Sequence, residues 1–524
     1  MPTHQAKDRP DMMSRHALHR WLPLVGILAT AALFDLFFWD RSIGLNLTLF
    51  GFWSMGMVVA RYGPGDLTMP ARLALAGATV ALVMLLVHHS TVALVAVVLS
   101  LAVFTAFAHE RQLRSVVYAL PQALCAFVMA PFNAWDGSVL WRPSEQRTGR
   151  GWRALRIALI PFLIGVVFFQ LYRAGNPRFE EFTAGFLNVL SDLLAELFTP
   201  HVFFILLGIW SSAVLIRRQA PRLMADLEQR WTDVLLRHRI RRPHWATPRA
   251  MGSLEKERKA GVMLLVLVNL LLLVVNAIDI HWLWFGFEVP EGFSLKQFVH
   301  EGTWVLILSI LLSIVILLHL FRANLNFYSR AGSLKMLGML WIAQNFILGI
   351  SVFLRNYHYI DFHGLAYKRI GVMVFLALML VGLVTLYIKI RERRSFFYLA
   401  RVNGWAAFVV LIGLSTVDWD STIVRYNLGH ENAGEIDIDN YLAMSDKVLP
   451  LIYADLDMVE KQMERHRTNE VRWVRHLDPG KFREELAVKL DRFKARYDAQ
   501  HWQEWNLADK RTMDRLLALN VYAR

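Results

Sequence analysis

Long apolar segments recur along this chain and are separated by short polar or basic stretches. The segments 262–277, 304–318 and 372–388 carry few or no charged residues. A helix that crosses a bilayer needs roughly 17–25 such residues, and in hydrocarbon its backbone groups must be paired within the segment. The pattern therefore predicts an all-α, polytopic membrane protein.

Eleven segments have the length and apolar character of membrane spans. Together they form a predicted transmembrane body over residues 21–417, and the spans are expected near 21–39, 45–60, 72–87, 91–108, 155–172, 201–216, 260–279, 303–321, 336–354, 370–390 and 402–417.

A further apolar segment, 116–132, is interrupted by Pro121 and Pro131. Proline removes a helix hydrogen bond, so we expect this segment to be re-entrant or interfacial rather than a span. If it does cross, every segment before it changes side. The segment 173–200 has apolar residues at helical spacing and is expected either to lie on the membrane as an amphipathic helix or to pack against neighbouring spans.

The basic residues predict the orientation, because lysine and arginine accumulate in cytoplasmic loops. They cluster in the N-terminal segment 1–20 and in the loop 217–259, which has twelve Lys/Arg against five Asp/Glu. We expect both on the cytoplasmic side of the membrane. With eleven spans, the C-terminus then lies on the opposite, outer side.

The composition changes after Val417. Residues 418–524 hold 17 Lys/Arg against 20 Asp/Glu, and apolar residues three or four apart predict helices within 439–465, 480–499 and 506–521. We expect a small extramembrane helical domain tied back to the membrane body.

Composition narrows the function classes. Of the 524 residues 55% are hydrophobic and only 19% charged, and the net charge of +14 is explained by membrane orientation rather than by nucleic acid. The expected partner is the lipid bilayer. The single cysteine, Cys125, excludes an intramolecular disulfide and cysteine-based zinc or iron–sulfur sites. We predict no cofactor.

Polar residues gather on the predicted outer face, in the expected loops 280–302 and 355–369 and after the last span. Histidine and carboxylate together suit a divalent metal, but their spacing matches no ligand signature, and we predict no metal site. Alternatively, Lys368 and Arg369 bind an anionic lipid phosphate, or extend to headgroups without specificity. The candidate cluster is His300, Glu301, Asn356, His358, Asp361, His363, Lys368, Arg369, Asp418, Asp420, Arg425, Tyr426 and Asn427.

Within this cluster, Arg425-Tyr426-Asn427 follows the last span closely, and we expect it to dock the C-terminal domain rather than to catalyse a reaction. Four polar residues fall inside or at the ends of spans: Asp35, Asn269, Asn276 and Asp279. Such residues are costly in a membrane and often functional. Asn269 and Asn276 are seven residues apart, so they share a helix face and either bond a neighbouring helix or line a polar path.

Several stretches together resemble a known family. The stretches are His300-Glu301-Gly302, residues 359–372, 401–405, 418–428 and 436–442. Within them, Ala366 and Gly404 stand where the family pattern has threonine and serine. The order and spacing of the stretches resemble bacterial membrane proteins grouped as domain of unknown function 4173, and the related group 4153. The resemblance implies a polytopic inner-membrane protein with an extramembrane C-terminal segment, and no reaction.

Three functions remain open. The chain lacks the phosphate-loop, G-x-S-x-G, H-E-x-x-H and dinucleotide-binding motifs, so we favour a non-enzymatic protein that senses or scaffolds an envelope process, with an envelope protein or anionic lipid bound through 418–524. A transporter or lipid flippase is the second hypothesis. The third is a glycosyltransferase-like membrane enzyme with a lipid-linked donor, in which Asp40 beside Arg41 is the candidate carboxylate.

Overall fold

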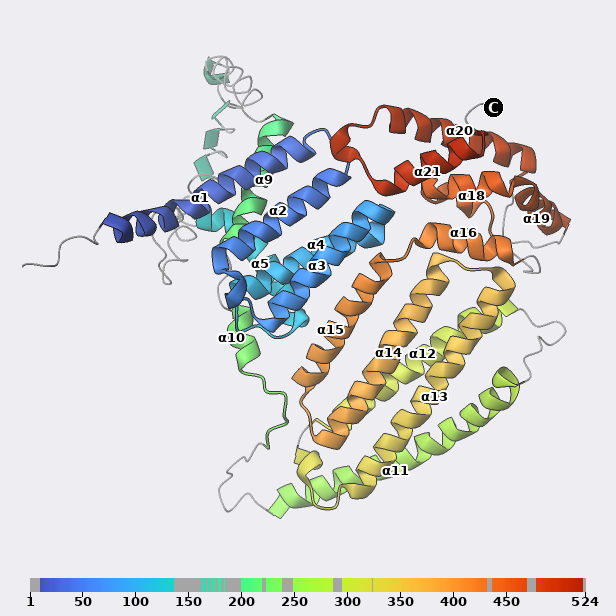
Figure 1. Cartoon of the computed structure of the whole chain (residues 1–524). Helices are drawn as coiled ribbons and strands as arrows, with labels where there is room; N and C mark the ends of the chain where they lie inside the picture. The colour runs from blue at the N-terminus through green and yellow to red at the C-terminus, as the bar shows by residue number, and fades with distance from the viewer. Residues whose placement is uncertain are drawn as a thin grey trace, which may run out of the picture.

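The computed structural model describes residues 10–135, 199–218, 223–237, 248–285, 295–322, 324–430, 436–468 and 477–521, with scattered positions in 161–183. These residues form helices joined by short connections, with no named strand among them. The helices form two groups of membrane-length helices, with a third group of shorter helices across one end (Figure 1). The all-α prediction is confirmed.

The first group comes from the N-terminal half of the chain. Its helices are α1 Pro10–Phe38, α2 Leu45–Tyr62, α3 Met69–His88, α4 Thr91–His109, α5 Val116–Trp135 and α9 Pro200–Ile216. Helix α1 contacts α2 and α9, and each of α2, α3 and α4 contacts the next helix along the chain.

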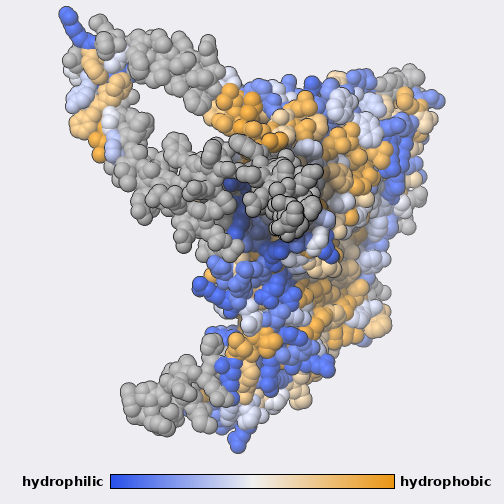
Figure 2. Space-filling view, turned by 60° about the vertical axis from the view of Figure 1, so that its left-hand side comes forward, coloured by the Kyte–Doolittle hydropathy of each residue, from blue (hydrophilic) through white to orange (hydrophobic). Residues whose placement is uncertain are grey.

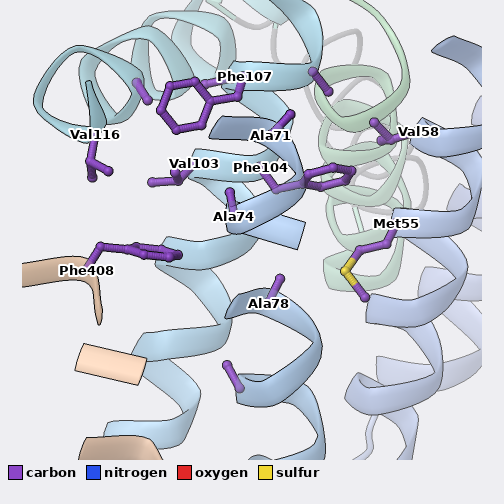
Figure 3. Packing of buried hydrophobic residues seen from close by; sticks show 14 of the residues in the cluster. Met55, Val58, Ala71, Ala74, Ala78, Val103, Phe104, Phe107, Val116 and Phe408 are labelled. Atoms are coloured by element: carbon purple, nitrogen blue, oxygen red, sulfur yellow. The ribbon is translucent and has the colours of Figure 1, made fainter. Parts of the chain in front are cut away.

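Small residues allow α3 and α4 to approach closely. Ala71, Ala74, Ala78 and Ala81 form one face of α3, and each is fully buried. Figure 3 shows the first three. Membrane helices gain little from hydrophobic exclusion and associate mainly through such close packing. Phe104 of α4 fills part of the space beside this alanine face.

The second group contains α11 Pro248–Asp279, its π-helical continuation η3 Ile280–Trp284, α12 Leu295–Leu320, α13 Gly332–His363 and α14 Tyr367–Glu392. Asn269 donates a hydrogen bond to Leu337 O and Asn276 to Gln344 O, each across 68 residues. Because this offset is constant, α11 and α13 run in the same direction side by side.

Helix α15, Phe396–Ser415, lies between the two groups (Figure 1). It contacts α14 on one side and α3, α4 and α5 on the other. Trp405 stacks on Phe107 of α4 with 5.6 Å between ring centres, and its indole N–H donates to Arg114 O. Gly77 of α3 allows α15 to approach α3 closely, since a Cβ at Gly77 would lie 2.8 Å from the ring of Phe408 in α15.

The chain after α15 folds back over one end of both groups (Figure 1). Its apolar core includes Tyr441, Leu449, Phe482, Phe493 and Leu516. The helices are α16 Trp419–Gly429, α17 Asn440–Ala443, η5 Asp446–Val448, α18 Leu449–Ala454, α19 Leu456–Thr468, α20 Pro479–Asp498, η6 Trp502–Glu504 and α21 Leu507–Ala518. We call the end that they cover the domain side, and the opposite end the basic side.

Seven helical segments of the described chain are long and apolar enough to cross a membrane. The predicted number of about eleven is therefore not confirmed. Three further apolar helices are shorter, Leu24–Phe38, Val116–Ala130 and Pro200–Ile216. The predicted span 155–172 and most of the predicted amphipathic helix 173–200 lie outside the described residues.

Two sequence predictions are changed by the helix bounds. The prolines at 121 and 131 do not interrupt α5, which runs unbroken from Val116 to Trp135. The expected loop 355–369 is wrong: α13 continues to His363 and α14 begins at Tyr367, which leaves a turn of only three residues. Arg355, Asn356 and Tyr359 are buried there, because other helices cover them. The apolar run of α13 therefore ends before the helix itself does, at the point where its side chains are covered by protein rather than exposed to lipid.

The surface of the helices matches a lipid environment. On α11, Met263, Leu267, Leu271 and Val274 are each more than half exposed, and apolar areas alternate with polar ones on the face seen in Figure 2. Basic residues concentrate at one end of the helices. Those at the basic side include Arg61, Arg72, Arg111, Arg114, Arg217, Arg218, Lys335, Arg391, Arg393 and Arg394.

Candidate functional site

The predicted polar cluster is brought together where the turn between α13 and α14 meets α16. Asn427 contacts Leu365 in this turn through both ends of its amide. Its Oδ1 accepts from Leu365 N at 2.6 Å and its Nδ2 donates to Leu365 O at 3.0 Å. Gly364 has φ +79° and a Cβ there would lie 2.6 Å from Asn427 Oδ1, so glycine is required by both conformation and space.

Arg369 closes the same turn from its α14 side. Its Nη1 donates to His363 O at 2.7 Å and also to Gly364 O, and its guanidinium lies 4.7 Å from the centre of the Tyr359 ring. Asn356 Nδ2 in turn donates to Arg369 O at 3.2 Å. The guanidinium therefore satisfies the carbonyl groups at the end of α13, as cations at helix C-termini do.

A second group of charges lies beneath the C-terminal helices. Lys447 of η5 is only 7% exposed, and its Nζ lies 2.9 Å from Asp418 Oδ1 and 3.7 Å from Asp420 Oδ2. The same Nζ donates to His88 O at the end of α3, at 2.7 Å. Asp420 accepts hydrogen bonds from the hydroxyls of Tyr367 and Ser445. We call Tyr367, Asp418, Asp420, Ser445 and Lys447 the interface cluster.

The electrostatics of this cluster favour the ionised state of Asp418. Burial alone would raise the pKa of this carboxyl. The Lys447 ammonium and the hydrogen bonds from Lys447 and Ser421 outweigh burial and lower the pKa below its ordinary value. The cluster is thus a set of paired, hydrogen-bonded charges that joins α3, α14, α16 and η5, as buried charges require.

The other predicted cluster residues lie around these contacts. Asp361 is mostly exposed and lies 3.6 Å from His430 Nε2, and Tyr426 stacks on the same His430 ring with centres 4.2 Å apart. His363 is buried against Tyr359, His358 is half-buried, and Lys368 and Arg425 are exposed. His300 and Glu301 belong to the first turns of α12, and their side chains lie outside the described residues.

The described residues contain no group of three or more histidine, cysteine, aspartate and glutamate side chains close enough to hold a metal ion. The Asp361 and His430 side chains form a pair only. His358 and His363 instead contact aromatic rings, those of Tyr357 and Tyr359 respectively.

The predicted intramembrane residues form a second polar region, between α11 and α13. Gln344 Nε2 donates to Asn269 Oδ1 at 2.8 Å, Asn276 donates to Gln344 O at 3.0 Å, and Asp279 pairs with Arg355. We call these five residues the polar seam. Asn269 and Asn276 therefore bond a neighbouring helix, which was one of the two alternatives drawn from their spacing.

Asp35 of α1, the fourth intramembrane candidate, pairs with another helix. Its Oδ1 lies 2.7 Å from His201 Nε2 at the start of α9. The His201 ring also stacks on Trp39, with 4.1 Å between ring centres. This contact fixes α9 against α1 at the domain side.

Sequence reasoning missed three residues that complete these sites. Lys447 lies in a mainly apolar stretch and was not singled out, although a lone cation beside Val448-Leu449-Pro450 is a signal for a buried charge. Gln344 and Arg355 supply the second half of the polar seam. Gln344 and Asn345 form a polar dipeptide inside an otherwise apolar run, and this pattern is a signal by which Gln344 could have been identified.

These features define a class: a multi-helical integral membrane protein whose C-terminal helices are docked on one end of the membrane helices. The chain matches the model of the family described as "Domain of unknown function (DUF4153)" over residues 71–454, and it belongs to that family. The sequence resemblance named group 4173 first and 4153 as its relative. Membership of group 4173 is not confirmed.

The matched range runs from the start of α3 to the end of α18, so it includes the interface cluster, the Asn427 contact and the polar seam. No curated protein matches the chain, and no solved structure matches it.

Proposed function

We propose that this protein is a non-enzymatic scaffold or sensor of the bacterial cell envelope, with its C-terminal helices as the part that meets a partner protein. The observation that carries this proposal is the use of the candidate reactive groups. Asp418, Asp420, Lys447 and Asn427 are engaged in contacts that hold the C-terminal helices on the membrane helices, and Arg369 binds the carbonyl groups of the turn that Asn427 contacts. Residues that are held in such contacts favour a fixed structural unit over a reactive centre. We call this unit, the helices α16 to α21, the platform.

Further contacts extend this attachment to α1 and α2. Trp505 O accepts from Leu45 N at 2.8 Å, and Gln503 Nε2 donates to Leu36 O at 3.1 Å. The Gly44 Cα approaches the Glu504 backbone so closely that a Cβ would clash with it. The platform therefore rests on both helix groups, and a partner that binds it would be coupled to the whole membrane body.

A groove on the C-terminal helices is the surface that we assign to the partner. It has a volume of about 810 Å³ and lies between α18, α19, α20 and the end of α21. Leu456, Met458 and Leu490 give it apolar walls. Its charged lining residues are three carboxylates, Asp455, Asp457 and Asp491, and one cation, Lys494, so carboxylates predominate. An extended or helical segment with both apolar and basic side chains complements such a groove.

The orientation is part of the proposal. With the basic side in the cytoplasm, as the positive-inside rule favours, the C-terminal helices face the periplasm. Alkaline phosphatase fused after Arg524 should then be active, whereas a fluorescent protein at the same position should stay dark. The reverse result would place the platform in the cytoplasm and overturn the assignment to the envelope.

The partner is tested with the full-length protein, chemically cross-linked in cells and purified under mild detergent. We expect a defined partner that is lost in the triple variant Asp455→Lys, Asp457→Lys, Asp491→Lys. The matched control is Glu484→Lys with Glu485→Lys, which changes exposed carboxylates on the outer part of α20. Equal recovery in both variants, or no cross-linked partner at all, would contradict a scaffold that uses this groove.

The polar seam supports a transporter or lipid flippase as a second candidate. Asp279 and Arg355 form a buried ion pair within membrane-length helices, and Asp279 Oδ2 has no hydrogen-bond partner. Buried ionisable residues of membrane-spanning helices commonly belong to substrate or ion paths. Unchanged solute uptake and lipid distribution in a deletion strain would argue against this candidate. For the glycosyltransferase-like enzyme no comparable observation exists among the described residues: Asp40 is exposed in the short connection between α1 and α2.

A further inference from the structure

A short segment joins the first helix group to the turn between α14 and α15 at the basic side. It comprises residues 230–237, directly after α10, and we call it the strap (Figure 1). The Arg114 guanidinium, just before α5, donates to Trp231 O at 3.2 Å. Ser395 N, just before α15, donates to Asp233 O at 2.9 Å. The strap is therefore level with the residues at which α5 and α15 begin.

The strap has two faces, because consecutive side chains of an extended segment point in opposite directions. An isolated antiparallel bridge pairs Val234 with Arg394 through the backbone. Asp233 faces the protein and forms a bidentate ion pair with Arg401 of α15, at 2.8 and 3.3 Å. Val234 and Leu236 are 50% and 65% exposed. The contacts of the inner face thus hold an apolar face outward.

Two aromatic side chains adjoin this apolar face. Trp231 is 55% exposed, and Phe396, the first residue of α15, is 64% exposed. Exposed apolar patches mark contacts with a membrane or with another protein. Helix α15 is long and apolar enough to cross a membrane, and Ala407, three turns after Phe396 on the same face, is also exposed. The patch thus continues into a surface that faces lipid, which favours the membrane as its partner.

The side chains of the strap suit the headgroup region of a bilayer. Tryptophan is enriched at this level because its ring is amphipathic. Arg230 and Arg237, at the two ends of the strap, are exposed. An arginine stem lies along apolar surface while its guanidinium reaches lipid phosphate, and each such cation near the surface adds to the attraction by anionic lipids.

We propose that the strap is a membrane anchor. Its apolar face and Phe396 lie among the headgroups and upper acyl chains of the leaflet at the basic side, and Arg230 and Arg237 bind the phosphates of anionic lipids. The bilayer would then hold the strap across the starts of α5 and α15 and so fix the first helix group relative to the second. The anchor needs no partner on the platform and holds for either orientation of the chain.

Spin labels measure the depth of the strap in the membrane. The full-length protein with Cys125→Ser and one added cysteine, Val234→Cys or Leu236→Cys, is labelled with a nitroxide in nanodiscs that contain phosphatidylglycerol. Collision rates with oxygen, which concentrates in lipid, are compared with those of a water-soluble nickel chelate. Leu267→Cys on the exposed face of α11 and Lys481→Cys on the platform are the lipid and water references. We expect both strap labels roughly 5–10 Å below the headgroup surface.

Two other results would overturn the proposal. A nickel collision rate equal to that at position 481 would place the strap in water, and low rates with both reagents would mean that protein covers it. Arg230→Gln with Arg237→Gln should raise the nickel collision rate at both strap positions, whereas Arg391→Gln, an exposed arginine at the end of α14, should not. An unchanged rate in the double variant would remove the phosphate contacts assigned to these arginines.

Discussion

Asn427 and Leu365 are joined by two hydrogen bonds, one in each direction, although 62 residues separate them. The side chain of Asn427 thus pairs with the turn between α13 and α14 as a neighbouring backbone strand would. This side chain therefore links the C-terminal helices to the second helix group, in addition to the hydrogen bond from the Tyr367 hydroxyl to Asp420.

Replacing Asn427 by alanine should loosen this link. The backbone N–H and C=O of Leu365 would lose their partners, at a cost of about 1–3 kcal/mol for each group that stays buried. We expect faster amide hydrogen exchange in α16 and in residues 364–366. Arg425→Ala, on the same helix but exposed, is the control and should leave exchange unchanged. Unaltered protection in Asn427→Ala would show that the link is not needed for docking.

Lys447→Met should destabilise the platform more strongly. The substitution leaves the buried Asp420 and the half-buried Asp418 without their cation. Breaking a fully buried pair from one side costs about 3–5 kcal/mol, which is the upper bound here. The melting temperature in detergent should fall, and adding Asp418→Asn should recover part of the loss by removing one charge. Lys481→Met, at an exposed position of α20, serves as the control. An unchanged melting temperature in Lys447→Met would refute the role assigned to the interface cluster.

The sequence allowed the helical elements to be predicted because lipid exposure leaves a strong apolar signal, as in α11 and α14. It also placed Asn269 and Asn276 on one face, since their spacing of seven follows directly from helix geometry. These inferences need only local information. The docking role expected for residues 425–427 has a counterpart in the Asn427 contact, although Arg425 itself is exposed.

Other parts of the site depend on contacts that no local pattern records. Lys447 meets Asp418 across 29 residues and His88 across 359. Arg355 and Asn356 end the apolar run of α13, so they indicate a loop by hydropathy, yet they are buried by protein rather than exposed to water. Hydropathy detects contact with lipid, and polar residues packed beneath a second layer of helices are invisible to it.

The polar seam should show measurable coupling between its two helices. In a double-mutant cycle of Asn269→Leu and Gln344→Leu, we expect an interaction free energy of about 0.6 kcal/mol, and at most about 1.7 kcal/mol, as for other hydrogen bonds between membrane helices. The quantity to measure is the free energy of unfolding in mixed detergent. Leu270→Ala combined with Gln344→Leu is the control, because Leu270 faces away from α13 and is more than half exposed. A coupling no larger than that of the control would remove the seam as a specific contact.

Glu228 provides a prediction on pH at the basic side. This residue of α10, Leu223–Gln229, is buried, and its carboxylate accepts hydrogen bonds from Arg114 N at 3.0 and 3.2 Å. Burial raises the pKa of Glu228 from 4.5 to about 7, although the contacts with Arg114 oppose the rise. The folded state therefore binds this proton more tightly than the unfolded state does, and stability should decrease as the pH rises from 4.5 to 7.

Glu228→Gln should abolish this dependence while keeping an acceptor for Arg114 N. Above pH 7 the variant should be more stable than the parent, by at most about 3 kcal/mol for a pKa shift of this size. Below pH 4.5, where the parent carboxyl is neutral in both states, the two proteins should be alike. Melting curves between pH 4 and 8 measure the difference, with Asp226→Asn on the exposed face of α10 as the control. A variant that is less stable than the parent at pH 8 would mean that the ionic contact with Arg114 outweighs the cost of burying the charge.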